Sequence, residues 1–131
     1  MRQGGPLTHR ILVAEDEADI RELLRLALSG AGYEVETAPD GAAALDQARV
    51  HPPSLVVTDL RMPRVNGLGL IRSLRAEPSL VRIPVILFTA YVSTDPGVAE
   101  ARQLQPVEVV TKGSISELRK AVARILKGGE T

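Results

Sequence analysis

Short apolar segments alternate with helical patterns along the whole chain, and this alternation restricts the folds that it can adopt. The short segments are too brief for helices and rich in β-branched residues, which is typical of strands. The helical patterns repeat apolar residues every three or four positions, as an amphipathic helix does. The predicted strands cover residues 11–14, 33–37, 55–57, 84–88 and 107–111, and the predicted helices cover residues 20–28, 40–49, 68–75, 93–104 and 115–126.

Two of these helices differ in the strength of their pattern. The first has a wide apolar stripe, which is expected to face inward and consists of Ile20, Leu23, Leu24, Ala27 and Leu28. The fourth, over residues 93–104, is the weakest, because Pro96 and Gly97 lie inside it. Proline in a helix interior removes a backbone donor and clashes with the preceding turn.

A regular alternation of strands and helices predicts a parallel sheet with helices on both faces and right-handed crossovers. Residues 11–14, 55–57 and 84–88 are apolar throughout, so these strands are expected inside the sheet. Residues 33–37 and, in part, 107–111 alternate, so they are expected at its edges. The strand order 2-1-3-4-5 satisfies both conditions. The predicted fold is a three-layer α/β sandwich of the flavodoxin-like type.

Composition excludes several classes of function. The length of 131 residues suits one domain, and 44% apolar residues can fill a core. The net charge is zero, which argues against nucleic-acid binding as the main role. The absence of cysteine rules out disulfides and zinc–thiolate sites. No apolar run approaches a membrane span, and the first residues lack a signal-peptide centre, so a soluble cytoplasmic protein is expected.

Polar residues follow four of the predicted strands. They are Glu15 and Asp16 after the first strand, Asp59 after the third, Thr89 at the end of the fourth and Lys112 after the fifth. In an open parallel sheet the carboxyl ends of the strands meet at one edge, and ligands bind where the strand order changes direction. These side chains are therefore expected to form one site.

The chemistry of such a site follows from its charges. Three neighbouring carboxylates repel one another, so cations must offset them. Lys112 can offset one, and a hard divalent ion with oxygen ligands, Mg²⁺, suits the remainder. A carboxylate nucleophile, a metal ion, a hydroxyl and an ammonium are the groups that phosphoryl transfer requires.

Four segments, ILVAEDE, LVVTDLRMPRVNG, VILFTA and VVTKG, together resemble the receiver domain of two-component response regulators, the chemotaxis-regulator-like fold. The resemblance covers about Thr8 to Lys127. It implies that Asp59 accepts a phosphoryl group from a histidine kinase or a histidine phosphotransfer protein, forming an aspartyl phosphate in a phosphorelay. It also implies Mg²⁺, with Mn²⁺ as a substitute, held by Glu15, Asp16, Asp59 and the backbone carbonyl of Arg61.

The same resemblance implies roles for other residues. Thr89 corresponds to a switch hydroxyl that turns toward the phosphoryl group, and Lys112 to the lysine that pairs with it. Arg61 and Tyr91 lie two residues beyond Asp59 and Thr89, at positions that tune dephosphorylation in the family. Simple exposure on a loop is an equal alternative for these two.

The sequence departs from the family's pattern at three places. Glu15 stands where Asp is commoner, which is an ordinary variation. Val109 stands where an aromatic residue is usual, and Gly113 where proline is usual. The residues for phosphorylation are therefore complete, whereas those for signal output are altered.

The domain prediction is a flexible N-terminal tail over residues 1–8, a receiver domain over 9–127, and a C-terminal tail or linker start over 128–131. The expected partners are the kinase or phosphotransfer protein and a downstream protein or an output domain absent from this chain. The resemblance also implies that the fourth helix, fifth strand and fifth helix form the partner-binding face, including for a homodimer. Nucleic acid and membrane are not expected partners.

Other functions remain open at this point. One is an interaction module that keeps the fold without being phosphorylated. Another is a Mg-dependent phosphatase of the haloacid dehalogenase type, although such enzymes need a second Asp where Arg61 stands. A flavin-binding flavodoxin shares the strand order but needs stacking aromatics, which are scarce here. The favoured prediction is a phosphoryl acceptor that assists its own phosphotransfer and is not a turnover enzyme.

Overall fold

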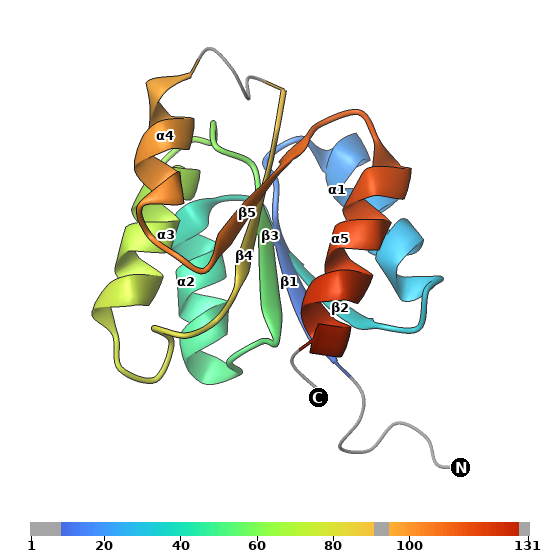
Figure 1. The fold of residues 1–131 in the computed structure, drawn as a ribbon, viewed down its shortest axis with the longest axis horizontal. Coiled ribbons are helices and arrows are strands. Elements are labelled where there is room, and N and C mark those ends of the chain that lie inside the picture. The colour runs from blue at the N-terminus through green and yellow to red at the C-terminus, as the bar shows by residue number, and fades with distance from the viewer. Residues whose placement is uncertain (1–8, 91–94, 129–131) are drawn as a thin grey trace.

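The structure, a computed structural model, describes residues 9–90 and 95–128. Within these residues five strands alternate with five helices (Figure 1). The strands are β1 (Arg10–Ala14), β2 (Glu34–Ala38), β3 (Leu55–Thr58), β4 (Val85–Thr89) and β5 (Val107–Thr111). The helices are α1 (Ala18–Ser29), α2 (Gly41–Val50), α3 (Gly67–Ala76), α4 (Pro96–Arg102) and α5 (Ile115–Gly128).

The strands form one parallel sheet in the order β2-β1-β3-β4-β5, as predicted. Helices α1 and α5 cover one face and α2, α3 and α4 cover the other, which gives the predicted three layers (Figure 1). In the register of the central strands, Ala14 lies opposite Thr58, and Thr58 lies opposite Leu87. The carboxyl ends of β1, β3 and β4 therefore finish at one edge of the sheet.

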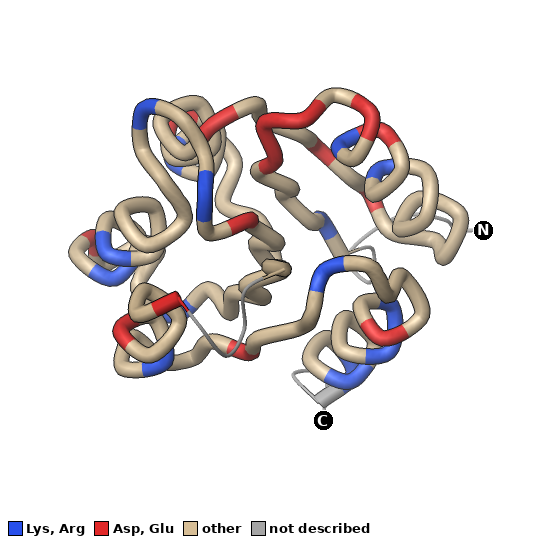
Figure 2. The backbone as a smooth tube through the Cα atoms, turned by 90° about the horizontal axis from the view of Figure 1, so that it is seen from above, with Lys and Arg blue, Asp and Glu red and all other residues tan. Residues whose placement is uncertain are grey.

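An aliphatic core lies on each side of the sheet because alternate strand residues point to opposite faces. Ile11 and Val13 pack with Leu24 of α1 and Leu118 of α5. Leu12 and its neighbours on β3 and β4 pack against α2, α3 and α4. Charged positions of both signs are intermixed around the molecule (Figure 2), in keeping with the zero net charge.

Two predictions about helices were wrong in detail. Leu23 does not face inward and is 52% exposed, because α1 buries a narrower stripe centred on Leu24 and Leu28. Helix α4 does not reach Leu104, and its described part begins with Pro96 in the first turn, capped by Asp95. Proline is favoured there because its missing N–H would have no helical partner.

The chain ends were predicted as tails, and they lie largely outside the described residues. Residues 1–8 and 129–131 are among those not described, while Gly128 is the last residue of α5. Among the described helices, none has the length and hydropathy needed to cross a bilayer.

Arg75, near the end of α3, binds the segments that lead into the amino ends of β4 and β5, on the side of the sheet opposite to the polar strand ends. Its guanidinium donates hydrogen bonds of 2.8–3.1 Å to four backbone carbonyls, those of Val81, Ile83, Leu104 and Pro106. Burial lowers the pKa of Arg75 from its ordinary value. One side chain therefore satisfies acceptors on the connections that enter β4 and β5.

Replacing Arg75 by Met is expected to lower the free energy of unfolding by about 3 kcal/mol, because the carbonyls lose a charged donor that a thioether cannot replace. The measurement is urea-induced unfolding. Arg72→Met in the same helix is the control, since the Arg72 side chain is more than half exposed and forms an ion pair with the exposed carboxylate of Glu100. An equal loss of stability in both variants would contradict the assigned role.

Candidate functional site

Asp59 lies at the tip of β3, and the loop that follows fixes its carboxylate. Oδ1 accepts hydrogen bonds from the backbone N–H groups of Leu60, at 2.7 Å, and Arg61, at 3.5 Å. The loop closes where the N–H of Gly67 donates to the carbonyl of Leu60, at 3.0 Å. Asn66 then caps α3 by accepting from the N–H of Gly69. The Asp59 carboxylate is thus held by hydrogen bonds from the backbone of the loop that follows it.

Two glycines allow this loop to pack closely. A Cβ on Gly67 would lie 2.2 Å from the backbone oxygen of Asp59. A Cβ on Gly41, the first residue of α2, would lie 2.2 Å from the backbone oxygen of Val65, to which the Gly41 N–H donates a hydrogen bond. Both contacts are with backbone, so neither can be relieved by rotating a side chain.

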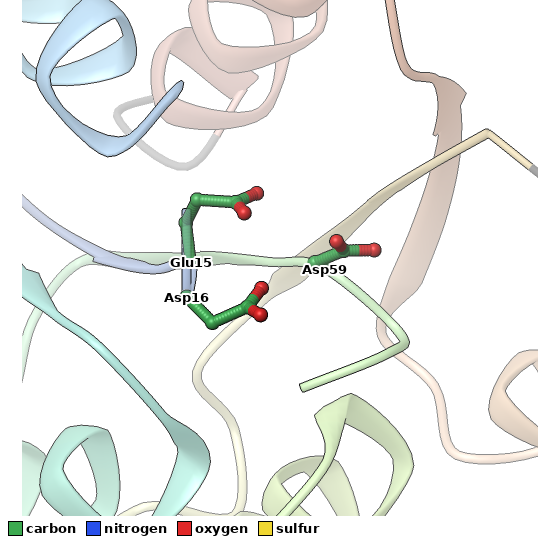
Figure 3. Close-up of side chains that lie close together, drawn as sticks. All are labelled: Glu15, Asp16 and Asp59. Atoms are coloured by element: carbon green, nitrogen blue, oxygen red, sulfur yellow. The ribbon is translucent and has the colours of Figure 1, made fainter. Parts of the chain in front are cut away.

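The acidic pair after β1 is positioned by Arg21 of α1. Its guanidinium donates to the backbone carbonyls of Glu15, at 2.8 Å, and Asp16, at 3.3 Å. One oxygen of the Glu15 carboxylate accepts from the N–H of Glu17, at 3.0 Å. Figure 3 shows the side chains of Glu15 and Asp16 directed toward Asp59.

The three carboxylates form a cluster that could hold a metal ion. One oxygen from each of Glu15, Asp16 and Asp59 lies within 4.8 Å of the others. Glu15 is buried, Asp59 is partly buried and Asp16 is exposed, so the cluster opens to solvent on one side. Carboxylate oxygens are the ligands that hard divalent cations prefer, and the donor set therefore fits Mg²⁺.

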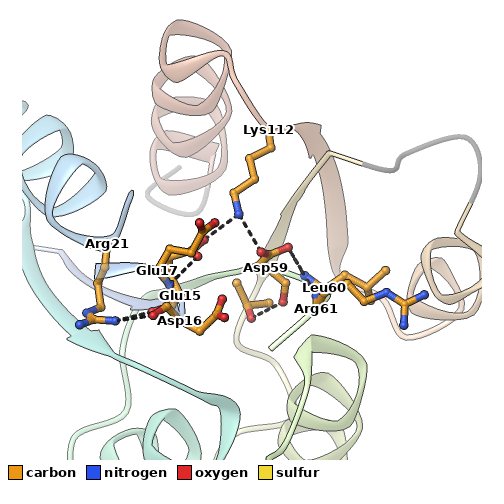
Figure 4. Close-up of polar contacts among 9 residues, drawn as sticks. Glu15, Asp16, Glu17, Arg21, Asp59, Leu60, Arg61 and Lys112 are labelled. Atoms are coloured by element: carbon orange, nitrogen blue, oxygen red, sulfur yellow. Dashed lines mark hydrogen bonds and ion pairs between the residues drawn. The ribbon is translucent and has the colours of Figure 1, made fainter. Parts of the chain in front are cut away.

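Lys112 joins this cluster from the end of β5 (Figure 4). Its Nζ lies 2.7 Å from Oδ2 of Asp59 and 3.0 Å from Oε1 of Glu15. Its backbone N–H donates to the carbonyl of Thr89, at 2.8 Å, which fixes the start of the side chain. The structure thus brings the predicted lysine to the predicted carboxylates.

The ionisation of Glu15, which is buried, and of Lys112, which is partly buried, reflects this arrangement. Burial raises the pKa of Glu15 above its ordinary value, although hydrogen bonds from Glu17 and Lys112 act in the opposite direction. Burial acts to lower the pKa of Lys112, and its hydrogen bonds to Asp59 and Glu15 outweigh that effect and raise it. The ammonium is therefore the stable form of Lys112 beside these carboxylates.

A hollow of about 300 Å³ lies over the cluster and gives access to Asp59. Its lining residues come from the ends of four strands and from α1, which contributes Ile20; they are Asp16, Glu17, Ile20, Asp59, Arg61, Ala90 and Lys112. A group larger than a metal ion can therefore approach the Asp59 carboxylate.

The other predicted site residues have different positions. Thr89 is fully buried at the end of β4, opposite Thr111. Val109 packs partly buried against the aliphatic core, and Gly113 has a φ of +108°, a backbone conformation that suits glycine. Tyr91 lies outside the described residues.

Sequence reasoning missed two residues that shape the site. Arg21 holds the backbone of the acidic pair, and Asp95, before α4, forms an ion pair with Arg61. The cap position of Asp95 could have been found from the Asp-Pro pair, which is a helix-start signal. The ion pair could not, because it joins residues from distant parts of the chain.

A doubly wound sheet with this cluster at its switch point defines the class of protein, and the chain belongs to the response regulator receiver domain family. The family's model matches residues 11–123. A curated relative, the "Probable transcriptional regulator ycf27" of Galdieria sulphuraria, is 46% identical over 81 residues, which are 62% of this chain and 31% of that protein.

Two solved structures show the same fold. The signal receiver domain of a signal transduction histidine kinase from Syntrophus aciditrophicus has a TM-score of 0.83 and 32% identity, with 92% of each chain covered. The response regulator TrrA of Thermotoga maritima, solved in complex with Mg(2+)-BeF, has a TM-score of 0.77 and 32% identity, with 90% of this chain and 99% of that one covered. The chain spans about a third of the length of the curated relatives it matches.

Gly67→Ala is expected to lower the free energy of unfolding by about 2 kcal/mol or more, because the new methyl group collides with the backbone of Asp59. Thermal or urea unfolding measures the change. Gly69→Ala is the matched control, since its Cβ would meet only side-chain atoms, the nearest 3.1 Å away, and alanine favours the helix. The assigned close approach is wrong if both variants unfold alike.

Lys112→Met is expected to lower the free energy of unfolding by about 2 kcal/mol without metal, because it leaves a buried carboxylate beside a second one without their cation. Added Mg²⁺ should stabilise this variant more than the wild type, since a cation then replaces the lost charge. Urea unfolding with and without Mg²⁺ measures both effects. Lys120→Met, at an exposed lysine, should match the wild type both in stability without metal and in the stabilisation by Mg²⁺.

Proposed function

We propose that Asp59 accepts a phosphoryl group from a phosphohistidine of a sensor kinase or of a histidine phosphotransfer protein, in a Mg²⁺-dependent phosphorelay. The observation that carries the proposal is the position of the Asp59 carboxylate. It opens into a hollow while it is flanked by two further carboxylates and an ammonium. Membership of the receiver domain family supports the same reaction.

The residues proposed to hold Mg²⁺ are the carboxylates of Glu15, Asp16 and Asp59 and the backbone carbonyl of Arg61. Mn²⁺ would suit the same oxygen ligands. When bound, the ion neutralises charge on the phosphoryl oxygens. The complex of TrrA with Mg(2+)-BeF supports this assignment by similarity.

The transfer step follows from groups of this chain. A carboxylate oxygen of Asp59 forms a bond to phosphorus while the P–N bond of the donor breaks, and the electron pair of that bond goes to the imidazole nitrogen. Lys112, already bound to Asp59, is positioned to pair with a phosphoryl oxygen. Glu15 also forms an ion pair with the Lys112 ammonium and so keeps it at the site. Thr89 is proposed as the hydroxyl that responds to the new group.

The consequence of phosphorylation is proposed to be a change in a partner-binding surface. The phosphoryl group adds nearly two negative charges, and such a charge can bias a two-state surface. The proposed surface consists of α4, β5 and α5, in a receiver unit over residues 9–127. The protein acts as an acceptor, and Arg61 and Tyr91 are proposed to set how long the group persists.

One observation favours a second function, a receiver-like module that signals by binding alone. Val109 packs into the aliphatic core where an aromatic switch residue is usual. An isopropyl group cannot swing between a buried and an exposed position as a large ring does. In this alternative, Mg²⁺ binding persists and phosphate uptake is absent.

Intact mass after incubation with Mg²⁺ and acetyl phosphate tests the acceptor. The wild type is expected to gain one phosphoryl group, and Asp59→Asn, which removes the nucleophilic oxygen but keeps the size of the side chain, is expected to gain none. EDTA should prevent the gain, because the acidic cluster then lacks its cation. Equal labelling of wild type and Asp59→Asn would show that the acceptor is another residue.

A further inference from the structure

The side chain of Arg61 is held away from the site by Asp95. Its Nε lies 2.7 Å and one terminal nitrogen 2.6 Å from Oδ2 of Asp95. The side chain of Asp95 is 5% exposed, whereas that of Arg61 is 65% exposed. Figure 4 shows the guanidinium directed away from Asp59, on the side opposite to Lys112 and the acidic pair.

Asp95 itself is fixed by the start of α4. Its second oxygen, Oδ1, accepts from the N–H of Gly97, at 2.9 Å, and its backbone carbonyl accepts from the N–H of Val98, at 3.0 Å. The carboxylate thus uses one oxygen for the helix cap and the other for Arg61. The Arg61 guanidinium is therefore paired with a carboxylate whose position is fixed by the first turn of α4.

Arg61 is close enough to the acceptor for this pairing to matter. Its backbone N–H is 3.5 Å from Oδ1 of Asp59, and Arg61 lines the hollow over the acidic cluster. A guanidinium binds phosphoryl oxygens with paired hydrogen bonds when it is free to reach them. The same positive charge opposes a metal cation nearby. The orientation of this one side chain therefore affects anions and cations at the site in opposite directions.

We propose that Asp95 is a positioning residue for phosphotransfer, which withholds the Arg61 guanidinium from the hollow and thereby keeps the site favourable for a metal cation. The proposal rests on the proposed function of Asp59. Loss of the Asp95 charge releases Arg61 toward the hollow. Reaction with an anionic phosphodonor then becomes faster and Mg²⁺ binding becomes weaker.

Asp95→Asn is the test variant, because asparagine caps helices as well as aspartate does but carries no charge. At saturating Mg²⁺, its rate constant for phosphorylation by acetyl phosphate, followed by intact mass, is expected to rise about fivefold. Isothermal titration calorimetry with Mg²⁺ alone is expected to show weaker binding. In an Arg61→Gln background, Asp95→Asn should change neither quantity.

Two further variants separate charge from structure. Asp95→Glu keeps the charge and loses the preferred cap, so it is expected to keep the wild-type rate, which a purely structural role would not predict. Glu100→Gln also removes one negative charge and also releases an arginine, Arg72, between α3 and α4, but away from the site. It is expected to leave both quantities unchanged.

Three outcomes would overturn the proposal: equal rates for wild type and Asp95→Asn, the same increase in the Arg61→Gln background, or the same increase in Glu100→Gln. Each of these leaves the role of Asp59 intact, because the wild type is still phosphorylated. Failure of the wild type to take up a phosphoryl group would instead overturn the proposed function and this inference together.

Discussion

The ion pairs of Lys112 with Glu15 and Asp59 are the interaction on which the site depends. They join the end of β5 to the ends of β1 and β3. Without Lys112, the sheet would bring the carboxylates of Glu15 and Asp59 together with no cation between them. Burial disfavours both the Glu15 carboxylate and the Lys112 ammonium, and each offsets that cost for the other. Lys112 thereby places a positive charge between two carboxylates that would otherwise repel each other.

The loop after Asp59 is held from both sides, and this explains why a carboxylate on a loop can be fixed. On one side Gly41 donates to the carbonyl of Val65, and on the other Asp95 binds Arg61. Between them, the backbone of the loop donates to Asp59. The loop that carries Asp59 is thus in direct contact with the starts of two helices, α2 and α4.

Much of this architecture follows from residues that are neighbours in sequence. The alternation of strands and helices predicted a parallel sheet, and the contrast between fully apolar and alternating strands predicted its order. Strand direction was sufficient to predict that Glu15, Asp59 and Lys112 would meet. Long-range side-chain contacts were beyond such reasoning. The pair of Arg61 with Asp95 depends on where α4 begins, and that helix had the weakest pattern because its proline and glycine were placed in its interior.

Val109 and Gly113 alter the region through which receiver domains usually signal, whereas Glu15, Asp16 and Lys112 all lie beside Asp59 as predicted. Val109 is partly buried and packs against the aliphatic core, and its isopropyl group has much less apolar area to bury or expose than an aromatic ring at that position. Arg61 is different, because it is largely exposed and linked by an ion pair to the cap of α4. If phosphorylation at Asp59 changes a surface of this protein, one physical connection is electrostatic, from Asp59 through Arg61 to the first turn of α4.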